Sequence, residues 1–536
     1  MVTERTPWWQ REGVISRVLA VAGVGVTLIG VLMLLVLAAQ AGFFGPVARV
    51  VAGGVFSAGL VGAGWRVFGR PGGRVGGIAL VATGIAGAYL DVVAVTGYYR
   101  WVPAGVGLAV ALAVALAGVG VAMRWQSQPL AVGVVLGAAV LSPALTTEVM
   151  LLGFLVVLQG AGVPVQMRRD WPVLHIARTM PVVLATLVMV VISEIYATID
   201  GSDPRNRVAL LAAALACAVV GLIGAVLTTH RRPADITASV TIALTALPTL
   251  AAALLFDRAV AAAIVGGLAA VLLALAATIF VPAPSRLRVP PHTALVSALT
   301  GAVALLHTCI TGTGGHLHLL PTALFAVALG FLGVATTTRN RVATGLGAAF
   351  TLLGGLTLFA LASPETLGAY HHADQDLDLA IAVAAIIGAA TAALLAWTVP
   401  RLPRADHVLV TGVWIAASLA GLYYVLVTAV SLGVTLGTED GFLLGHSLAT
   451  IIWMIAATAA LFYGLRRLTT APAKVFLVSG LLVAAAALAK LFLFDLATLS
   501  GLVRVAAFLV VGMLLLLTGT RYARAFADSA SNSARK

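Results

Sequence analysis

The chain has 536 residues, of which 61% are hydrophobic and only 10% are charged. A soluble protein of this length would carry about a quarter charged residues, so this composition excludes an ordinary soluble fold. The formal net charge of +13 is spread in ones, twos and threes between apolar runs, which argues against a nucleic-acid-binding surface. Cys217 and Cys309 lie in different apolar runs, and we expect two core residues rather than a disulfide or metal pair.

Apolar runs recur from end to end, and each is long enough to cross roughly 30 Å of hydrocarbon. Backbone polar groups in lipid must be satisfied within the segment, so these runs must be helices. The first run, Val18 to Leu37, follows a charged start and precedes Ala39-Gln40-Ala41, which resembles a signal-peptidase site. It exceeds the roughly 7 to 15 apolar residues of a signal peptide, so we interpret it as an uncleaved first span.

The sequence therefore predicts an all-α polytopic membrane protein with about 18 transmembrane helices, short loops and no soluble domain. The spans centre near residues 28, 57, 86, 112, 137, 155, 187, 218, 245, 270, 300, 327, 352, 387, 420, 455, 483 and 511. We expect a cytoplasmic segment at 1–13, the helical bundle at 14–522 and a disordered cytoplasmic tail at 523–536. Pro143 and Glu148 leave two interpretations open for residues 128–164, namely two full spans or a re-entrant hairpin.

The basic residues predict the orientation of these spans. Placing both termini inside puts most Arg residues in the even-numbered loops, as the positive-inside rule requires. The odd-numbered loops and their flanks hold only Arg49, Arg100, Arg205, Arg207, Arg258 and Arg504. The same loops hold Asp200, Asp203, Asp257, Glu365, Asp374, Asp376, Asp378, Glu439 and Asp440. The outer face is thus expected to be acidic.

Ionisable residues within spans are costly and are the first candidates for function. They are Asp91, Glu148, His175, Arg178, Glu194, His307, His446, Lys490, Asp495 and Arg504. Most lie within two or three turns of a predicted outer boundary, where snorkelling or an ion pair at the rim explains them as well as a site does. Asp91 is the exception, because it lies about two turns inside and has no long stem with which to reach water. His175 and Arg178, three residues apart, share one helical face.

The segment "AKLFLFDLATLSGLVR" gathers three of these charges near the C-terminus. Lys490 and Asp495 are five residues apart, roughly 140° around a helix and roughly 7.5 Å along it, so a direct pair within the helix is not expected. We expect Lys490 to find its counter-ion on another helix, at Asp91 or Glu194. Asp495 and Arg504 flank a short turn and could contact each other.

Histidines in the predicted outer loops raise the question of a metal site. His316 and His318 lie in one loop, and His371 and His372 lie in another beside three aspartates. Imidazole and carboxylate suit zinc, but no HExxH or HxxxH spacing occurs, so we expect neither a metal nor a cofactor. P-loop, dinucleotide-binding and nucleophile-elbow motifs are also absent from the sequence.

Several segments resemble the predicted bacterial membrane proteins called domain of unknown function 2339. "GFFGPVARVVAG", "GIAGAYLDVVAVTGYY" and "LAVGVVLGAAVLSPAL" are similar to its N-terminal segments. In the last spans, Lys490, Phe492, Asp495, Leu496 and Arg504 match its K-x-F-x-x-D-L turn and closing Arg. The resemblance covers residues 10–165 and 440–526. It implies a bacterial inner-membrane protein, but the family has no settled activity to carry over.

Three functions are open at this stage. The first is a carrier, flippase or channel-like protein that serves the cell envelope, with membrane lipids and an ion or lipid-linked substrate as partners; many spans, short loops and few intramembrane charges favour it. The second is a membrane enzyme acting on lipid-linked substrate at the outer face, which the acid-free first outer loop "AQAGFFGP" disfavours. The third is a non-catalytic scaffold for envelope assembly.

Overall fold

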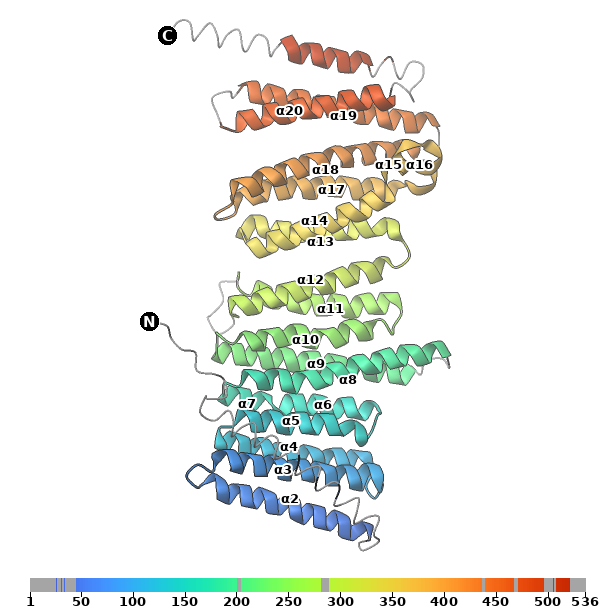
Figure 1. The fold of residues 1–536 in the computed structure, drawn as a ribbon. Helices are drawn as coiled ribbons and strands as arrows, with labels where there is room; N and C mark the ends of the chain where they lie inside the picture. Colours follow the sequence, from blue (N-terminus) through green and yellow to red (C-terminus); the bar gives the residue numbers. More distant parts are fainter. Residues whose placement is uncertain are drawn as a thin grey trace, which may run out of the picture. The chain divides into compact units, whose positions relative to one another are not determined.

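The computed structural model describes residues 45–199, 204–280, 289–435, 439–466, 471–495 and 508–520, together with residues 26, 30, 33 and 505. The chain divides into two compact units, Met1–Thr308 and Cys309–Lys536. Helices connected by short loops make up both units, and no strand occurs in the described ranges (Figure 1). The all-helical class predicted from the sequence is confirmed.

The first unit contains helices α2 to α11 and most of α12, which crosses the boundary between the units. Their bounds are α2 Pro46–Phe68, α3 Arg74–Val93, α4 Ala104–Trp125, α5 Gln128–Leu141, α6 Val149–Ala161, α7 Val163–Arg168, α8 Pro172–Ile199, α9 Pro204–Arg231, α10 Ile236–Ala253, α11 Arg258–Ala277 and α12 Pro291–Thr313. A π-helical turn, Ala94–Tyr98, extends α3.

The second unit contains helices α13 to α20. Their bounds are α13 Leu320–Thr338, α14 Arg341–Leu361, α15 Pro364–Gly368, α16 Tyr370–Asp376, α17 Leu379–Thr398, α18 His407–Val434, α19 Glu439–Arg466 and α20 Ala471–Lys490. A second π-helical turn, Leu491–Asp495, follows α20, and an apolar helix covers Phe508–Thr520.

Fifteen helices in the described ranges are long and apolar enough to cross a membrane. Two further apolar helices, Gln128–Ala144 and Phe508–Thr520, are shorter. Each predicted centre from residue 57 to residue 511 falls in one of these helices, whereas the predicted first span lies almost wholly outside the described residues. The count of fifteen is lower than the predicted 18 because two of the apolar helices are short and because the predicted first span lies almost wholly outside the described residues.

Residues 128–164 form two helices of unequal span. Helix α5 ends at Leu141, and Pro143 lies in the 3₁₀ turn Ser142–Ala144 that follows it. Helix α6 starts after Glu148, and α6 and α7 together make a candidate span of 20 residues. One member of this pair is thus of full length and the other is short.

Hydrogen bonds and ion pairs join helix ends and loops that share one predicted side of the membrane. These contacts join Arg74 with Trp125, Arg169 with Met123, Asp170 with Arg232, His292 with Pro233 and Arg341 with Arg404 on the predicted inner side, and His318 with Asp378 on the predicted outer side. Each contact joins two segments that the positive-inside pattern assigns to the same side, and the orientation itself stays a prediction.

Small residues bring the helices close together within each unit. A Cβ atom added at Gly64 of α2 would lie 2.8 Å from the carbonyl oxygen of Gly77 on α3, so these two backbones are in direct contact. Gly433 of α18 likewise leaves no room for a Cβ beside the Gly441 carbonyl of α19. Close backbone approach through glycine is typical of helix packing in lipid, where helices gain no hydrophobic energy from meeting.

Candidate functional site

The candidate site lies at an interruption between α6 and α7. Helix α6 ends at Ala161, Gly162 separates the two helices, and Pro164 follows in the first turn of α7. Proline has no N–H group, so α6 cannot continue unbroken through this position. The last carbonyl groups of an α-helix lack partners within the helix and need a donor from elsewhere.

Arg178 of α8 supplies that donor. Its Nη1 donates to the Gln159 carbonyl oxygen at 2.8 Å, which places a cation at the negative end of α6. The side chain passes over Gly162, where an added Cβ would lie 2.7 Å from Arg178 Cδ. An added Cβ at Gly224 of α9 would lie 3.2 Å from Nη2. The two glycines therefore shape a slot for this arginine.

His175 connects Arg178 to a carboxylate. Its Nε2 lies 3.2 Å from Asp235 Oδ2, and its Nδ1 lies 3.5 Å from Arg178 Nη2. Because an arginine can only donate, Nδ1 must be the accepting nitrogen, and Nε2–H then donates to Asp235. A neutral imidazole in this tautomer links the cation to the anion. His175 is fully buried and Arg178 is 2% exposed.

Asp235, at the start of α10, is the last residue in this series of contacts. It is the N-cap of that helix, and its Oδ1 accepts hydrogen bonds from the Ala238 backbone N–H and the Thr237 hydroxyl. Burial alone would raise the pKa of Asp235, but these hydrogen bonds and the neighbouring His175 outweigh burial and hold the pKa below its usual value. The carboxylate is therefore ionised at neutral pH.

The positive charge of Arg178 has no carboxylate in direct contact. Among the described residues, Arg178 is the one Asp, Glu, Lys or Arg side chain that is fully buried, and Asp235 reaches it only through His175. Its Nε has no hydrogen-bond partner, and the same is true of Oε1 of the fully buried Gln159. A buried donor and a buried acceptor without partners are costly, and such atoms in a native fold mark places where a ligand or water can bind.

A rim of polar contacts surrounds this site on the predicted inner side. Asp170, just before α8, forms an ion pair with Arg232 at 3.3 Å, after the end of α9. His292 Nε2 donates to the Pro233 carbonyl at 2.7 Å, so its Nδ1 accepts from the Ser239 hydroxyl at 2.8 Å. The ion pair joins the start of α8 to the end of α9, and the two hydrogen bonds join α12 to the α9–α10 loop and to α10.

Asp91 lies on the face of α3 that packs against α2. The side chain is half-buried, and its Oδ2 is buried without a hydrogen-bond partner among the described residues. The carboxyl group contacts Gly53, where an added Cβ would lie 3.0 Å from Oδ2. Asp91 lies in the candidate span Arg74–Tyr98, and its role as a functional residue stays a prediction.

Three other sequence candidates lie away from the buried site. Glu148 is an exposed N-cap residue before α6, so it lies at a helix end and not inside a span. Glu194 is exposed on α8, and His307 is half-buried on α12. None of the three contacts Arg178 through a hydrogen bond or ion pair within the described ranges.

The second unit brings His446 and Lys490 together, which the sequence did not indicate. Lys490 Nζ donates to the His446 carbonyl at 3.0 Å and to the Thr450 hydroxyl at 2.8 Å. His446 is 2% exposed, and its Nε2 donates to the Leu367 carbonyl at 3.0 Å. The partners described for Lys490 are thus oxygens of α19. Asp91 and Glu194 belong to the first unit, and their pairing with Lys490 stays a prediction. The Asp495 side chain and Arg504 lie outside the described residues.

The two histidine-containing loops meet at one point. His318 forms an ion pair with Asp378 at 3.4 Å, and Asp378 is also the N-cap of α17. His316 and His372 are exposed, and the His371 side chain lies outside the described part. No group of three or more potential metal ligands occurs among the residues that the structure describes.

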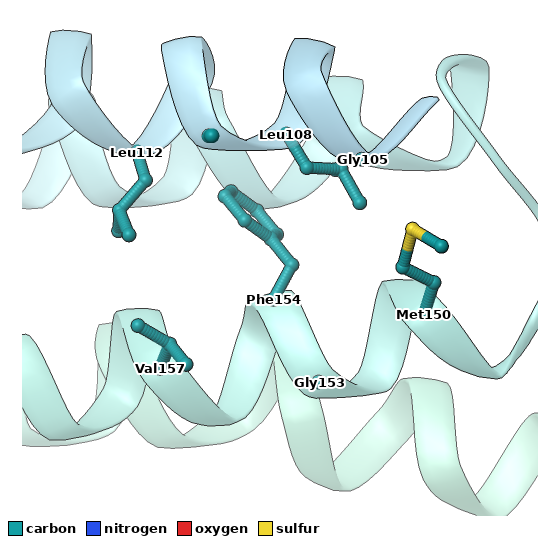
Figure 2. Close-up of a pocket in the computed structure, with 8 residues that line it drawn as sticks. Gly105, Leu108, Leu112, Met150, Gly153, Phe154 and Val157 are labelled. Carbon is teal, nitrogen blue, oxygen red and sulfur yellow. The ribbon is translucent and has the colours of Figure 1, made fainter. Parts of the chain in front are cut away.

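An apolar groove of about 280 Å³ lies between α4 and α6. Figure 2 shows Phe154 of α6 pointing toward Leu108 and Leu112 of α4, with Met150 and Val157 on either side. Gln159 lies two residues beyond Val157, about 200° around the helix, so the groove and the Arg178 site occupy opposite faces of α6. The side chains that line the groove are apolar, so the groove suits a lipid chain and offers no polar group for chemistry.

Sequence reasoning missed Asp235 and Gln159. Asp235 carried a usable signal, because an aspartate directly before an apolar run is a typical helix N-cap. Its loop also belongs to the predicted inner side, as does the start of the span that holds His175. Gln159 carried no such signal, since a single amide in an apolar run gives no indication of its neighbours.

Comparison with known proteins gives a family. A family model described as "Predicted membrane protein (DUF2339)" matches residues 16–365, about two thirds of the chain. The chain therefore belongs to this family. The match includes the N-terminal segments on which the resemblance rested and continues through the middle, whereas the C-terminal segment around Lys490 lies beyond it. No curated protein and no solved structure matches.

Proposed function

We propose that this member of the family is a carrier that moves an anionic group, of the phosphate type, through the membrane. Arg178 is the binding cation, and Gln159 is its neighbour in the site. The proposal includes a place in the bacterial cytoplasmic membrane and a role in the cell envelope, as the family resemblance implies. The cargo is a phosphate group, either free or at the head of a lipid.

The observation that carries this proposal is the buried, incompletely bonded charge of Arg178. A guanidinium group has five N–H donors in a planar fork that suits phosphate. The printed contacts of Arg178 use Nη1 and Nη2, and Nε has no partner among the described residues. A monoprotonated phosphate group both accepts and donates hydrogen bonds, so it matches the donor Nε–H and the acceptor Gln159 Oε1 together.

The backbone around Arg178 supports movement. The α6–α7 interruption at Gly162 lies on one side of the arginine, and Pro181 interrupts the hydrogen bonding of α8 one turn beyond it. Carriers commonly build their binding sites at discontinuous helices, where the backbone can yield. The site is closed in this structure, so cargo entry requires these helices to separate.

Binding in detergent solution tests the proposal without a transport assay. The thermal unfolding midpoint of the purified protein is measured against inorganic phosphate and, separately, against a short-chain phosphatidic acid. We expect one of the two probes to raise the midpoint, because a ligand that binds only the folded state stabilises it. The two probes separate a free anion from a lipid headgroup as cargo.

Two variants give the control. Arg178→Lys retains the charge but loses the planar fork, and it is expected to abolish the shift while remaining folded. Arg168→Gln removes an exposed charge from the end of α7 and is expected to keep the shift. An equal shift in both variants, or no shift with either probe in the wild type, would contradict the assignment of Arg178 as a phosphate-binding residue.

A further inference from the structure

The carboxyl group of Asp91 lies between α3 and α2, where no ion pair joins it to a cation among the residues that the structure describes. Its side chain points from α3 to α2, where it meets Gly53 and Gly54. One turn further along the same interface, Ser57 fills the space beside Gly87, and beyond it Gly64 contacts Gly77. Asp91 therefore ends a tightly packed row of small residues between two apolar helices.

The ionisable groups nearest to Asp91 in the elements packed against α3 do not pair with it. Arg49 lies one turn from Gly53 on α2, and no ion pair joins it to Asp91 among the described residues. Arg66 of α2 and Arg124 of α4 lie at the predicted inner ends of their helices, whereas Asp91 lies nearer the predicted outer end of α3. Helix α5 contains no ionisable residue. Arg100 is exposed in the loop that follows the π-helical turn.

The predicted first span and the residues between it and α2 supply no cation either. Residues 18–44, which include the predicted first span, contain no ionisable side chain. A carboxylate in hydrocarbon must pair with a cation or take up a proton. Sodium would require several oxygen ligands, whereas the surface facing Asp91 is helical backbone at two glycines, whose carbonyls are engaged in the helix.

The backbone next to Asp91 is also unusual. The π-helical turn Ala94–Tyr98 begins three residues after it, and the Ala94 N–H is shared between the carbonyls of Asp91 and Leu90. π-helical turns are rare, and this one replaces the last turn of α3. This irregularity is independent of the carboxyl group's lack of a partner, and both features occur within one turn.

We propose that Asp91 is a proton-binding site within the membrane, formed by its carboxyl group against Gly53 and Gly54 of α2. The proton is taken from and returned to water at the predicted outer end of α3. This site is separate from Arg178 and does not depend on the cargo proposed for that residue.

Reaction with dicyclohexylcarbodiimide tests the proposal directly. This hydrophobic reagent modifies protonated carboxyl groups in apolar surroundings, and mass spectrometry of peptides locates the label. In membrane vesicles we expect a label at Asp91 that declines as the pH is raised, because only the protonated carboxyl group reacts. Asp91→Asn is expected to lose this label. If the folded protein is unlabelled at Asp91 throughout while the SDS-unfolded chain is labelled there, the proposal is overturned.

Matched glycine variants test the geometry, and a salt exchange tests the ligand. Gly53→Ala places a methyl group where the carboxyl group lies, so Asp91 should be displaced and should react faster with the reagent from the lipid phase. Gly59→Ala adds a methyl group in open space, so Asp91 in this variant should be labelled at the wild-type rate. Equal labelling rates of Asp91 in the two variants would contradict the position of the carboxyl group.

The salt exchange compares labelling of Asp91 in sodium chloride and in N-methylglucamine chloride at constant pH. Protection from the label by sodium chloride would show a sodium site instead and overturn the proton assignment.

Discussion

The side chain of Arg178 lies in the space that a Cβ atom at Gly162 would require, with its Cδ 2.7 Å from that position. The arginine therefore depends on the absence of a side chain at the interruption between α6 and α7. This contact joins the one fully buried charge of the described residues to the point where a membrane helix is broken.

The first prediction concerns this contact. Gly162→Ala should displace Arg178 and weaken its bond to the Gln159 carbonyl, and overpacking of this kind costs about 1–3 kcal/mol. Thermal unfolding in detergent measures the effect. Gly153→Ala, on the outer turn of α6, has no atom within 4 Å of its new Cβ and serves as the control. Equal stability of the two variants would show that the slot at Gly162 is not required.

The second prediction concerns the charge itself. Arg178→Gln removes the hydrogen bonds to Gln159 and His175 and leaves the Gln159 carbonyl without its donor, and losing a charged hydrogen bond costs about 1.5–3 kcal/mol. Arg168→Gln, which is exposed, should change the stability by less than about 0.5 kcal/mol. Unfolding of the two variants side by side gives the comparison. A smaller loss of unfolding free energy for Arg178→Gln than for Arg168→Gln would contradict the buried, hydrogen-bonded position of Arg178.

The third prediction is a pH dependence from Asp235. Its pKa is lower in the folded protein than in the unfolded chain, so its stabilising effect is complete above the unfolded pKa of about 3.9 and is lost as the pH falls through the folded pKa. Asp235→Asn should therefore flatten the acid limb of the stability curve below about pH 5. The exposed Glu148 gives the control variant Glu148→Gln, which should retain the limb. If the stability of Asp235→Asn falls with decreasing pH as steeply as that of the wild type, the result would argue against an ionised, hydrogen-bonded Asp235.

The fourth prediction concerns the second unit. Lys490→Met removes the hydrogen bonds to the His446 carbonyl and to the Thr450 hydroxyl, and each is worth about 1 kcal/mol. A double-mutant cycle with Thr450→Val measures the pairwise part of this effect. We expect a coupling free energy of at least about 0.5 kcal/mol, because the two side chains are in contact. Strictly additive losses would mean that the Lys490–Thr450 bond contributes nothing to stability.

Much of the fold could be predicted from the sequence, because lipid imposes a simple rule on it. Apolar runs must be helices, so their centres could be placed by hydropathy alone, and the helices at residues 57 to 511 agree with those centres. The length of the helix at Gln128–Ala144 was harder to predict, because Pro143 and the short apolar run allowed two interpretations. The family was also recognisable from the N-terminal segments, within the residues that the family model matches.

The candidate site could be predicted only in part. The spacing of His175 and Arg178 put both on one face of a helix, and the structure brings them within 3.5 Å. Their partners came from α6 and from the start of α10, far apart in the chain, and hydropathy gives no information on which helices are neighbours. For the same reason the sequence did not indicate the contacts of Lys490 with a carbonyl and a hydroxyl group of α19.

The most direct test of the carrier function measures phosphate movement across a bilayer. Protein reconstituted into liposomes is assayed in two arms, with radiolabelled inorganic phosphate uptake and with dithionite bleaching of a fluorescent phosphatidic acid. We predict that wild type and Arg168→Gln accelerate movement in one arm, while Arg178→Lys, inserted to the same level, does not. Movement equal to that of protein-free liposomes in both arms, or full activity of Arg178→Lys, would contradict the account.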